Sequence, residues 1–321
     1  MAVREVARPL AIPARKERSL WADAFQRLLL NRMAVAGGLF LIFIVILAII
    51  ADFIAPYSFA ENHLKDNYAP PGAKYLLGAD ALGRDILSRT IYGTRVSISV
   101  AIVAATVSLV VGLTYGLISG YLGGRVDDIM MRVVDFIYGV PILIFVILME
   151  VYFKAISRRG AATGLAAIFI KIDTALGGLF FVFVAMGLLN WIGMARIARG
   201  QVLSYKEKEF TTAARMVGAG PLRIIFRHLL PNVLGPCVVQ ETLSIPGYIL
   251  TEAFLSFLGL GVNPPTPSWG IMIQEGYQAL RSTPHVLFAP SAALTLTVLA
   301  FNFLGDGLRD AFDPMLRGVI K

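Results

Sequence analysis

The stretch "MAVAGGLFLIFIVILAIIA", residues 33–51, contains no charged side chain in 19 positions. An apolar helix of about 20 residues spans the hydrocarbon core of a bilayer, which is roughly 30 Å thick. This stretch therefore predicts a membrane-spanning helix. A cleavable secretory signal is the alternative, but the apolar part of such a signal has only about 7 to 15 residues. Here 32 residues precede a longer apolar run, which favours the spanning helix.

Similar apolar runs recur along the rest of the chain. Hydrophobic residues make up 57% of the sequence and charged residues only 16%, against about 45 to 50% and 25% in an average soluble domain. The excess is concentrated in six runs, at residues 33–51, 96–122, 133–153, 175–195, 233–261 and 286–304. The sequence therefore predicts an all-α membrane protein with six transmembrane helices.

The distribution of lysine and arginine predicts the side of the membrane that each connection occupies. Basic residues in short connections are retained on the cytoplasmic side. With the N-terminus inside, the inner segments hold 19 of the 29 basic residues and the outer segments hold 10. Both termini are therefore expected in the cytoplasm. The outer segment 154–174 is unusually basic, and its stretch "GLAAIFI" is too short to cross, so we interpret it as an external or interfacial insertion.

Several functional classes lack the residues that they require. The net charge of +8 follows the distribution that membrane topology demands, which argues against binding to DNA or RNA. The single cysteine, Cys237, excludes an internal disulfide, and the three histidines fall in three different segments, so no metal site is predicted. None of the eight lysines follows a glycine, so the chain has no P-loop for ATP. We expect no catalytic residue, cofactor or metal in this chain.

The half-polar stretch "EFTTAARMVGAGPLRIIFRHLLPN", residues 209–232, lies between two apolar runs. Residues at positions i, i+3, i+4 and i+7 lie on one face of a helix. This spacing is found at Phe210, Ala213, Ala214 and Val217. Thr211 and Arg215 point elsewhere. Gly218 is a natural end for this helix.

A second short helix is predicted directly after the glycine. Pro221 suits its first turn, and Pro231 is expected to end it. Its apolar face is predicted at Leu222, Ile225, Phe226 and Leu229. Helices of about two turns need packing against other structure to be stable. A DNA-binding helix pair is excluded by the flanking spans, which leaves the lipid surface or, as we favour, a groove on a cytoplasmic protein.

These residues resemble the cytoplasmic-loop signature of permease subunits of bacterial ATP-binding-cassette importers. That signature reads Glu-Ala-Ala, three residues, Gly, nine residues, Ile-x-Leu-Pro. The residues at matching positions are Ala213, Ala214, Gly218, Leu230 and Pro231. Two positions depart, because Thr212 replaces the glutamate and His228 replaces the isoleucine. The ending "RHLLPN" is typical of the peptide branch of the family.

Four further segments resemble the second permease of oligopeptide and dipeptide systems. They are "RSLWADAFQRLLLNRMAV" (18–35), "LLGADALGRDILSRTIYGTRVSIS" (76–99), "EAFLSFLGLGVNPPTPSWG" (252–270) and "FNFLGDGLRDAFDP" (301–314). The resemblance covers about residues 18–150 and 176–315, and the insertion at 154–174 is the main departure.

The resemblance implies the type I importer permease fold in the bacterial cytoplasmic membrane. It implies a pore formed with a second permease, two ATPase subunits that use ATP and Mg²⁺, and an extracytoplasmic peptide-binding protein. The resemblance also implies that the helix pair docks on an ATPase through Phe210, Thr212, Ala213, Ala214, Arg215, Val217, Gly218, His228 and Pro231. Nickel complexes or glutathione remain alternative substrates.

The predicted spans and the resemblance together divide the chain into four parts. They are a cytoplasmic segment 1–32, a first span with its external loop 33–95, a permease domain 96–310 with a coupling loop at about 196–232, and a cytoplasmic tail 311–321. An ion-coupled secondary transporter is the alternative function, but it should show inverted repeats and several ionisable groups at the midplane. A receptor or structural membrane protein gives no reason for the cytoplasmic helix pair.

The fifth apolar run contains two carboxylates, Glu241 and Glu252. They are 11 residues apart, so an unbroken helix would place both on one face. Buried carboxylates in a membrane face a wet cavity or a partner. They are candidates for the translocation pathway, with structural packing as the slightly favoured alternative. Pro236 and the pair at 246–247 are expected to bend or break this helix.

An external charged cluster has two possible roles. Asp80, Arg84, Asp85 and Arg89 would either order their own loop, which we favour, or contact a partner protein. Trp269 is expected at the membrane interface, where tryptophan is enriched.

Overall fold

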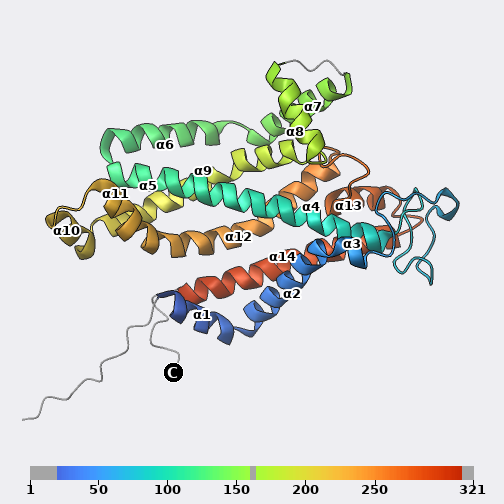
Figure 1. The fold of residues 1–321 in the computed structure, drawn as a ribbon, viewed down its shortest axis with the longest axis horizontal. Helices are drawn as coiled ribbons and strands as arrows, with labels where there is room; N and C mark the ends of the chain where they lie inside the picture. The colour runs from blue at the N-terminus through green and yellow to red at the C-terminus, as the bar shows by residue number, and fades with distance from the viewer. Residues whose placement is uncertain (1–19, 160–163, 313–321) are drawn as a thin grey trace, which may run out of the picture.

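A computed structural model describes residues 20–159 and 164–312 (Figure 1). The N-terminal residues 1–19, the tail from residue 313 and part of the 154–174 insertion therefore lie outside the described residues. The only β-type pairing in the described ranges is an isolated bridge between Ala79 and Asp85. The predicted all-α class is confirmed.

The helices follow one another with short connections, apart from the segment between α3 and α4. They are α1 (Leu20–Leu30), α2 (Arg32–Ile49), α3 (Ala51–Ile54), α4 (Ile86–Val107), α5 (Leu113–Leu122), α6 (Gly124–Gly139), α7 (Ile142–Arg159), α8 (Gly164–Ala175), α9 (Phe180–Lys206), α10 (Glu209–Met216), α11 (Pro221–Ile224), α12 (Leu230–Phe257), α13 (Trp269–Gln278) and α14 (His285–Phe312). Two π turns, Ser108–Gly112 and Ile225–Leu229, join α4 to α5 and α11 to α12. A 3-10 turn lies at Leu64–Asp66.

Five helical segments in the described chain are long and apolar enough to cross a membrane. They are Arg32–Ile49, Ile86–Leu122, Phe180–Lys206, Pro221–Phe257 and His285–Phe312. Four of them extend well beyond the predicted apolar runs. Two start early, at Ile86 instead of residue 96 and at Pro221 instead of residue 233, and two end late, at Lys206 instead of residue 195 and at Phe312 instead of residue 304. Residues 86–95 and 196–206, which were predicted to lie in loops, are therefore helical. The predicted apolar runs end at charged residues. The helices continue past these residues because their arginines are paired within the protein.

The third predicted run, 133–153, is not one helix. α6 ends at Gly139 and α7 begins at Ile142. Val140 between them is extended, with ψ 134°, because the ring of the following Pro141 disfavours a helical conformation. The expected continuous span is thus replaced by an amphipathic helix followed by an apolar one.

The predicted insertion at 154–174 is mostly helical in its described part. α7 continues to Arg159 and α8 begins at Gly164. Figure 1 shows these two helices projecting sideways from the bundle. Gly177 and Gly178 then adopt positive φ values of 65° and 86°, which separate α8 from α9. This is why α9 begins at Phe180 rather than at residue 175.

The long helices run side by side, so the molecule has two distinct ends. Figure 1 shows α10, α1 and the C-terminal part of α14 at one end. The segment between α3 and α4 lies with α13 at the opposite end. We call the first the α10 end and the second the α13 end.

Three glycines allow α5 and its preceding π turn to approach α9 closely. Gly112, Gly116 and Gly120 recur every fourth residue and therefore share one helical face. A Cβ on Gly116 would lie 2.5 Å from the Ala195 carbonyl oxygen, and one on Gly112 would lie 2.6 Å from that of Trp191. Small residues at this spacing are typical of close helix packing in membranes. We call this contact the glycine seam.

α12 remains one helix in spite of its prolines. It includes both Pro236 and Pro246 within its bounds, so of the predicted bend or break, the break does not occur. α12 packs against α4, α9, α13 and α14, and Pro246 is buried. Packing by neighbouring helices allows prolines within membrane helices.

Candidate functional site

The corner between α10 and α11 is closed by backbone hydrogen bonds around Gly218. The Gly218 N–H donates to the Arg215 carbonyl at 2.9 Å, and the Ala219 N–H donates to the Ala214 carbonyl at 3.0 Å. This is the Schellman arrangement, which favours a residue with positive φ at the position of the glycine. Gly218 has φ 84°, and a Cβ there would meet no atom within 4 Å. Backbone conformation, and not lack of space, therefore explains this glycine.

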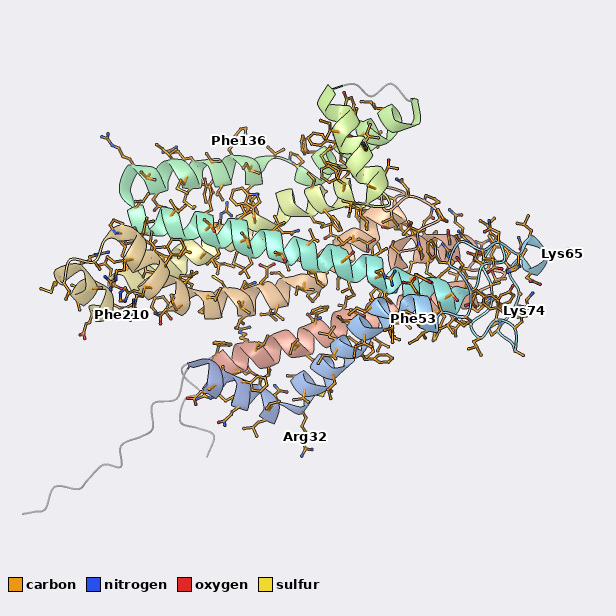
Figure 2. All side chains as sticks on the ribbon, in the orientation of Figure 1. Arg32, Phe53, Lys65, Lys74, Phe136 and Phe210 are labelled. Carbon is orange, nitrogen blue, oxygen red and sulfur yellow. The ribbon has the colours of Figure 1, made fainter. Side chains whose placement is uncertain are left out.

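Exposed apolar side chains gather at this corner. We call them the corner strip, and with their exposed fractions they are Val217 (89%), Met216 (86%), Leu222 (70%), Phe226 (62%) and Phe210 (39%). Figure 2 shows Phe210 at the α10 end, far from Lys65 and Lys74 at the α13 end. Exposed apolar side chains grouped on one surface mark a site of interaction.

The opposite side of the helix pair packs against the bundle. Thr211 is fully buried, and its hydroxyl donates to the Tyr205 carbonyl at 2.9 Å. Ile224, Ile225 and Leu229 are buried in one cluster with residues of α5 and α9. The prediction of one shared apolar face is therefore wrong, because Leu222 and Phe226 are exposed whereas Ile225 and Leu229 are buried. The π turn changes the helical period there, so regular spacing does not identify the buried side.

The second helix does not end at Pro231. The Leu230 N–H donates to the Ile225 carbonyl, the wide bonding of a π turn. Pro231 has no N–H, and its ring needs space near the carbonyl four residues earlier. A widened turn before the proline gives that space, so α11 continues into α12. His228 lies in this turn, and its carbonyl accepts a hydrogen bond from the Asn232 side chain at 2.7 Å.

All nine residues predicted to dock an ATPase lie in the corner or the π turn and its following residues. The exposed ones are Phe210, Thr212, Ala213, Arg215, Val217, Gly218 and Pro231, whereas Ala214 and His228 are half-buried. The Thr212 hydroxyl lies 3.5 Å from the Lys208 carbonyl, a local contact within α10. Met216 was missed by the sequence analysis, although its place at the end of α10, directly before the corner, is a usable signal.

An ion pair between the half-buried Arg199 and the buried Asp127 joins α9 to α6 at the α10 end. Arg199 donates from Nε and Nη2 to the two carboxylate oxygens of Asp127, each at 2.6 Å. Ser119 of α5 also donates to Asp127. Hydrogen bonds from the Arg199 guanidinium hold the pKa of Asp127 below its usual value. Sequence analysis missed this pair because its residues are 72 positions apart.

Glu241 lies beside the π turn of the α4–α5 segment. It is 5% exposed. The Ser108 hydroxyl donates to its Oε2 at 2.9 Å, and the Tyr248 hydroxyl donates to its Oε1 at 2.8 Å. Glu241 also lines a pocket of about 280 Å³ between α6, α9, α12 and the π turn.

Glu252 lies on the same face of α12, as predicted for an unbroken helix. The hydroxyls of Ser97 and Ser256 donate to it at 3.1 and 2.7 Å. Ser97 and Ser108 are 11 residues apart on the α4 segment, as the two glutamates are on α12. Glu252 is 1% exposed and does not line the pocket of Glu241. Its contacts match the structural role, whereas Glu241 alone has access to a space that can hold a ligand.

At the α13 end, the charged cluster forms a network within the chain. Arg84 and Arg89 both contact Asp80 and Glu275, and the Arg84–Asp80 contact is 2.7 Å. Asp85 starts α4 by accepting a hydrogen bond from the Ser88 N–H at 2.8 Å. These contacts order the loop and join it to α13, which is the favoured one of the two predicted roles.

The tryptophan at the start of α13 is not at an interface. Trp269 is fully buried, and its Nε1 donates to the Thr90 carbonyl at 3.2 Å. It packs in a cluster with Ile44 and Ile98. The prediction of an interfacial position is wrong because α2 and α4 cover this side chain.

Comparison with known proteins gives the family. Residues 112–318 match the family described as "Binding-protein-dependent transport system inner membrane component". Residues 19–71 match the "N-terminal TM domain of oligopeptide transport permease C". These two ranges include the first span, the helix pair and the α12 carboxylates.

Individual relatives match over nearly their whole length. The oligopeptide transport system permease protein OppC of Bacillus subtilis is 41% identical over 304 residues, 95% of this chain and 92% of that protein. The dipeptide transport system permease protein DppC of the same species is 41% identical over 296 residues, 92% of this chain and 86% of that protein. The glutathione transport system permease protein GsiD of Pectobacterium atrosepticum is 38% identical over 303 residues, covering 94% and 93%. This chain therefore belongs to the family of binding-protein-dependent transport system inner membrane components, as a multi-pass permease similar to OppC and DppC.

Proposed function

We propose that this chain forms half of the pore of an ATP-driven importer for oligopeptides or dipeptides. A second permease completes the pore, two separate ATPase subunits hydrolyse ATP with Mg²⁺, and an extracytoplasmic binding protein delivers the peptide. The chain itself is a non-catalytic membrane subunit. The observation that carries the proposal is the corner strip, because it is an apolar surface on a chain that has no P-loop of its own.

The helix pair is suited to bind, as a rigid element, in a groove on an ATPase. Its inner side is buried against α5 and α9, so the pair is supported before it meets a partner. Its outer side leaves Met216 and Val217 almost fully exposed. Amphipathic helices bind grooves through such apolar side chains. Because α9 leads directly into α10, a movement of the corner would act on the glycine seam.

We also infer six crossings of the inner membrane, with both termini in the cytoplasm. Five come from the long apolar helices, and α6 with α7 supplies the third crossing in two pieces. The return path supports this, since α5 ends and α9 ends at the same α10 end of the molecule (Figure 1). The chain between them must therefore travel back toward the α13 end before α9 begins.

The relatives belong to transport systems for peptides and for glutathione. Oligopeptide and dipeptide permeases are each 41% identical to this chain, and glutathione permeases are slightly less similar at 38%. Glutathione is itself a small peptide, so peptide bonds with free terminal charges are the shared chemistry. We therefore favour short peptides.

The corner strip can be tested by changing one side chain at its tip. Val217→Asp should prevent ATPase docking, because a charge on an 89% exposed apolar residue would have to be buried without a partner. The affinity-tagged chain, purified in detergent from cells that express all subunits, should retain the second permease and lose the ATPase. Leu76→Asp is the matched control, since Leu76 is 63% exposed in the connection at the α13 end. That variant should keep the ATPase.

Two results would contradict the proposal. A Val217→Asp complex that retains its ATPase and imports peptide would remove the corner strip from the docking surface. Accumulation of solute by the unmodified chain alone in vesicles, without ATPase or ATP, would show a secondary transporter instead.

A further inference from the structure

The pocket beside Glu241 lies in the middle of the long helices. Glu241 occupies a central position in the segment Pro221–Phe257, and Ser108 lies within Ile86–Leu122. At about 1.5 Å per residue, Glu241 is roughly 24 Å along the helix from Phe257 and roughly 30 Å from Pro221. Membrane transporters hold their substrates near such a midpoint. This position distinguishes the pocket from the docking surface at the α10 end.

The pocket has the polarity of a site for a small polar group. Its volume is about 280 Å³, near the lower limit of pockets that bind small molecules, about 300 Å³. Its polar lining consists of Ser108, Tyr138, Asn190, Gln240, Glu241, Ser244 and Tyr248. Such a space suits the end of a peptide better than a whole long chain.

Among the described residues that line this pocket, Glu241 is the only charged one. Two hydroxyls donate to it, one to each carboxylate oxygen. A carboxylate has about four acceptor positions, so this arrangement leaves room for a further donor. An ionisable group inside a membrane protein is costly unless it meets a partner. The lining residues offer no cation, and a cationic ligand would complete the site.

A neighbouring arginine does not take this role. The Arg196 guanidinium lies 4.5 Å from the ring centre of Tyr138, one of the lining residues. Its Nη2, however, donates to Asp135 at 2.8 Å. Arg196 is thus paired outside the pocket, and its charge is already offset there.

We propose that this pocket binds the terminal ammonium group of a peptide through Glu241 during passage across the membrane. The inference rests on the proposed peptide-import function and adds a binding site within the permease. The ammonium donates to the free acceptor positions of the carboxylate, and the amide and hydroxyl groups of Asn190, Gln240 and Ser244 surround the first residue of the peptide. A blocked terminus lacks the charge and loses this interaction.

The test measures binding to the purified complex of both permeases and both ATPases, without the binding protein and without ATP. The probes are radiolabelled dialanine and N-acetyl-dialanine, in equilibrium dialysis. The wild-type complex should bind dialanine at least about tenfold more tightly than the acetylated probe, equal to about 1.4 kcal/mol. Glu241→Gln should abolish this difference, while Glu252→Gln should retain it, because Glu252 is a buried carboxylate outside the pocket.

A second pair of variants tests the space instead of the charge. Gly193 lines the pocket, and a Cβ on it would meet no atom within 4 Å. Gly193→Leu should fill the pocket and weaken dialanine binding about tenfold, whereas Gly193→Ala should have little effect. Both variants leave Glu241 and its two hydroxyl donors in place.

The possible outcomes separate this inference from the proposed function. Equal binding of the two probes by the wild-type complex, no binding of either, or an unchanged preference in Glu241→Gln would overturn the pocket assignment. ATP-driven peptide import by the complete reconstituted system is measured in parallel. Import that persists in those cases leaves the proposed function intact, and absence of import for every peptide would overturn the function itself.

Discussion

Two glycines show how differently the contact between α5 and α9 and the corner between α10 and α11 are built. Gly116, in the glycine seam, would place a Cβ 2.5 Å from the Ala195 carbonyl oxygen. Gly218, at the corner beyond the end of α9, has φ 84° and no atom within 4 Å of a Cβ position. The first glycine is required by lack of space and the second by backbone conformation. The seam is packed as a fixed interior contact, whereas the corner leaves space for a partner.

This difference has a mechanical consequence. α9 is packed along the glycine seam and then leads into α10, which carries the exposed side chains. A partner that moves the corner would therefore act on a helix that is firmly packed against α5. A loosely packed seam would not transmit the movement of the corner to α5. A corner covered by other parts of the same chain would not be reached by a partner.

The largest expected effect comes from breaking the seam. Gly116→Ala should destabilise the purified importer complex by about 3 kcal/mol, because the added methyl group overpacks a backbone contact. Gly200→Ala on α9 is the matched control, since its Cβ would meet no atom within 4 Å and it gains the same helix propensity. Thermal unfolding followed by size-exclusion chromatography compares them. Equal stability of the two variants would show that the seam is not tightly packed.

The ion pair at the α10 end of the seam should have a smaller effect. Asp127→Asn removes a bidentate contact with Arg199 and should cost about 2 kcal/mol at pH 7. The control is Asp128→Asn, because the neighbouring Asp128 is exposed. Chemical unfolding of the complex in detergent provides the measurement.

The pH dependence of this pair has a defined sign. The native pKa of Asp127 lies below the ordinary value of 3.8, so its stabilising effect is fully present above about pH 4. It should be lost as the pH falls through the lowered native pKa. The difference between wild type and Asp127→Asn should therefore stay constant from about pH 5 to 8. A difference that disappeared near pH 6 would contradict this assignment.

The smallest effect on stability is expected at the corner. Gly218→Val should cost about 1 kcal/mol, because a branched residue disfavours positive φ. Its effect on function should be larger, with less peptide imported per ATP hydrolysed in proteoliposomes and unchanged membrane insertion. Gly218→Asn should retain more coupling, since asparagine tolerates this conformation. Normal import by the valine variant would remove the corner from the coupling path.

The sequence predicted much of the fold and the place of the glycine corner. Apolar runs identified the five long helices, and the spacing around Gly218 identified the helix pair. The helix boundaries near Ile86 and Lys206 were predicted wrongly. Charged residues end an apolar run in the sequence, and hydropathy does not take account of the ion pairs that these residues form in the structure. The repeat at Gly112, Gly116 and Gly120 was a readable signal for the glycine seam, but the sequence alone did not name α9 as its partner.

The sequence by itself determined which segments are apolar enough to cross a bilayer, that the chain has no P-loop, and where the glycine corner lies. These are local properties, fixed by side-chain chemistry and spacing within a few turns. Only the tertiary structure decided which side of the helix pair is exposed and which carboxylate meets a pocket. Those outcomes depend on contacts between distant residues, such as Ser108 with Glu241, 133 positions apart, and no local pattern encodes such a pairing.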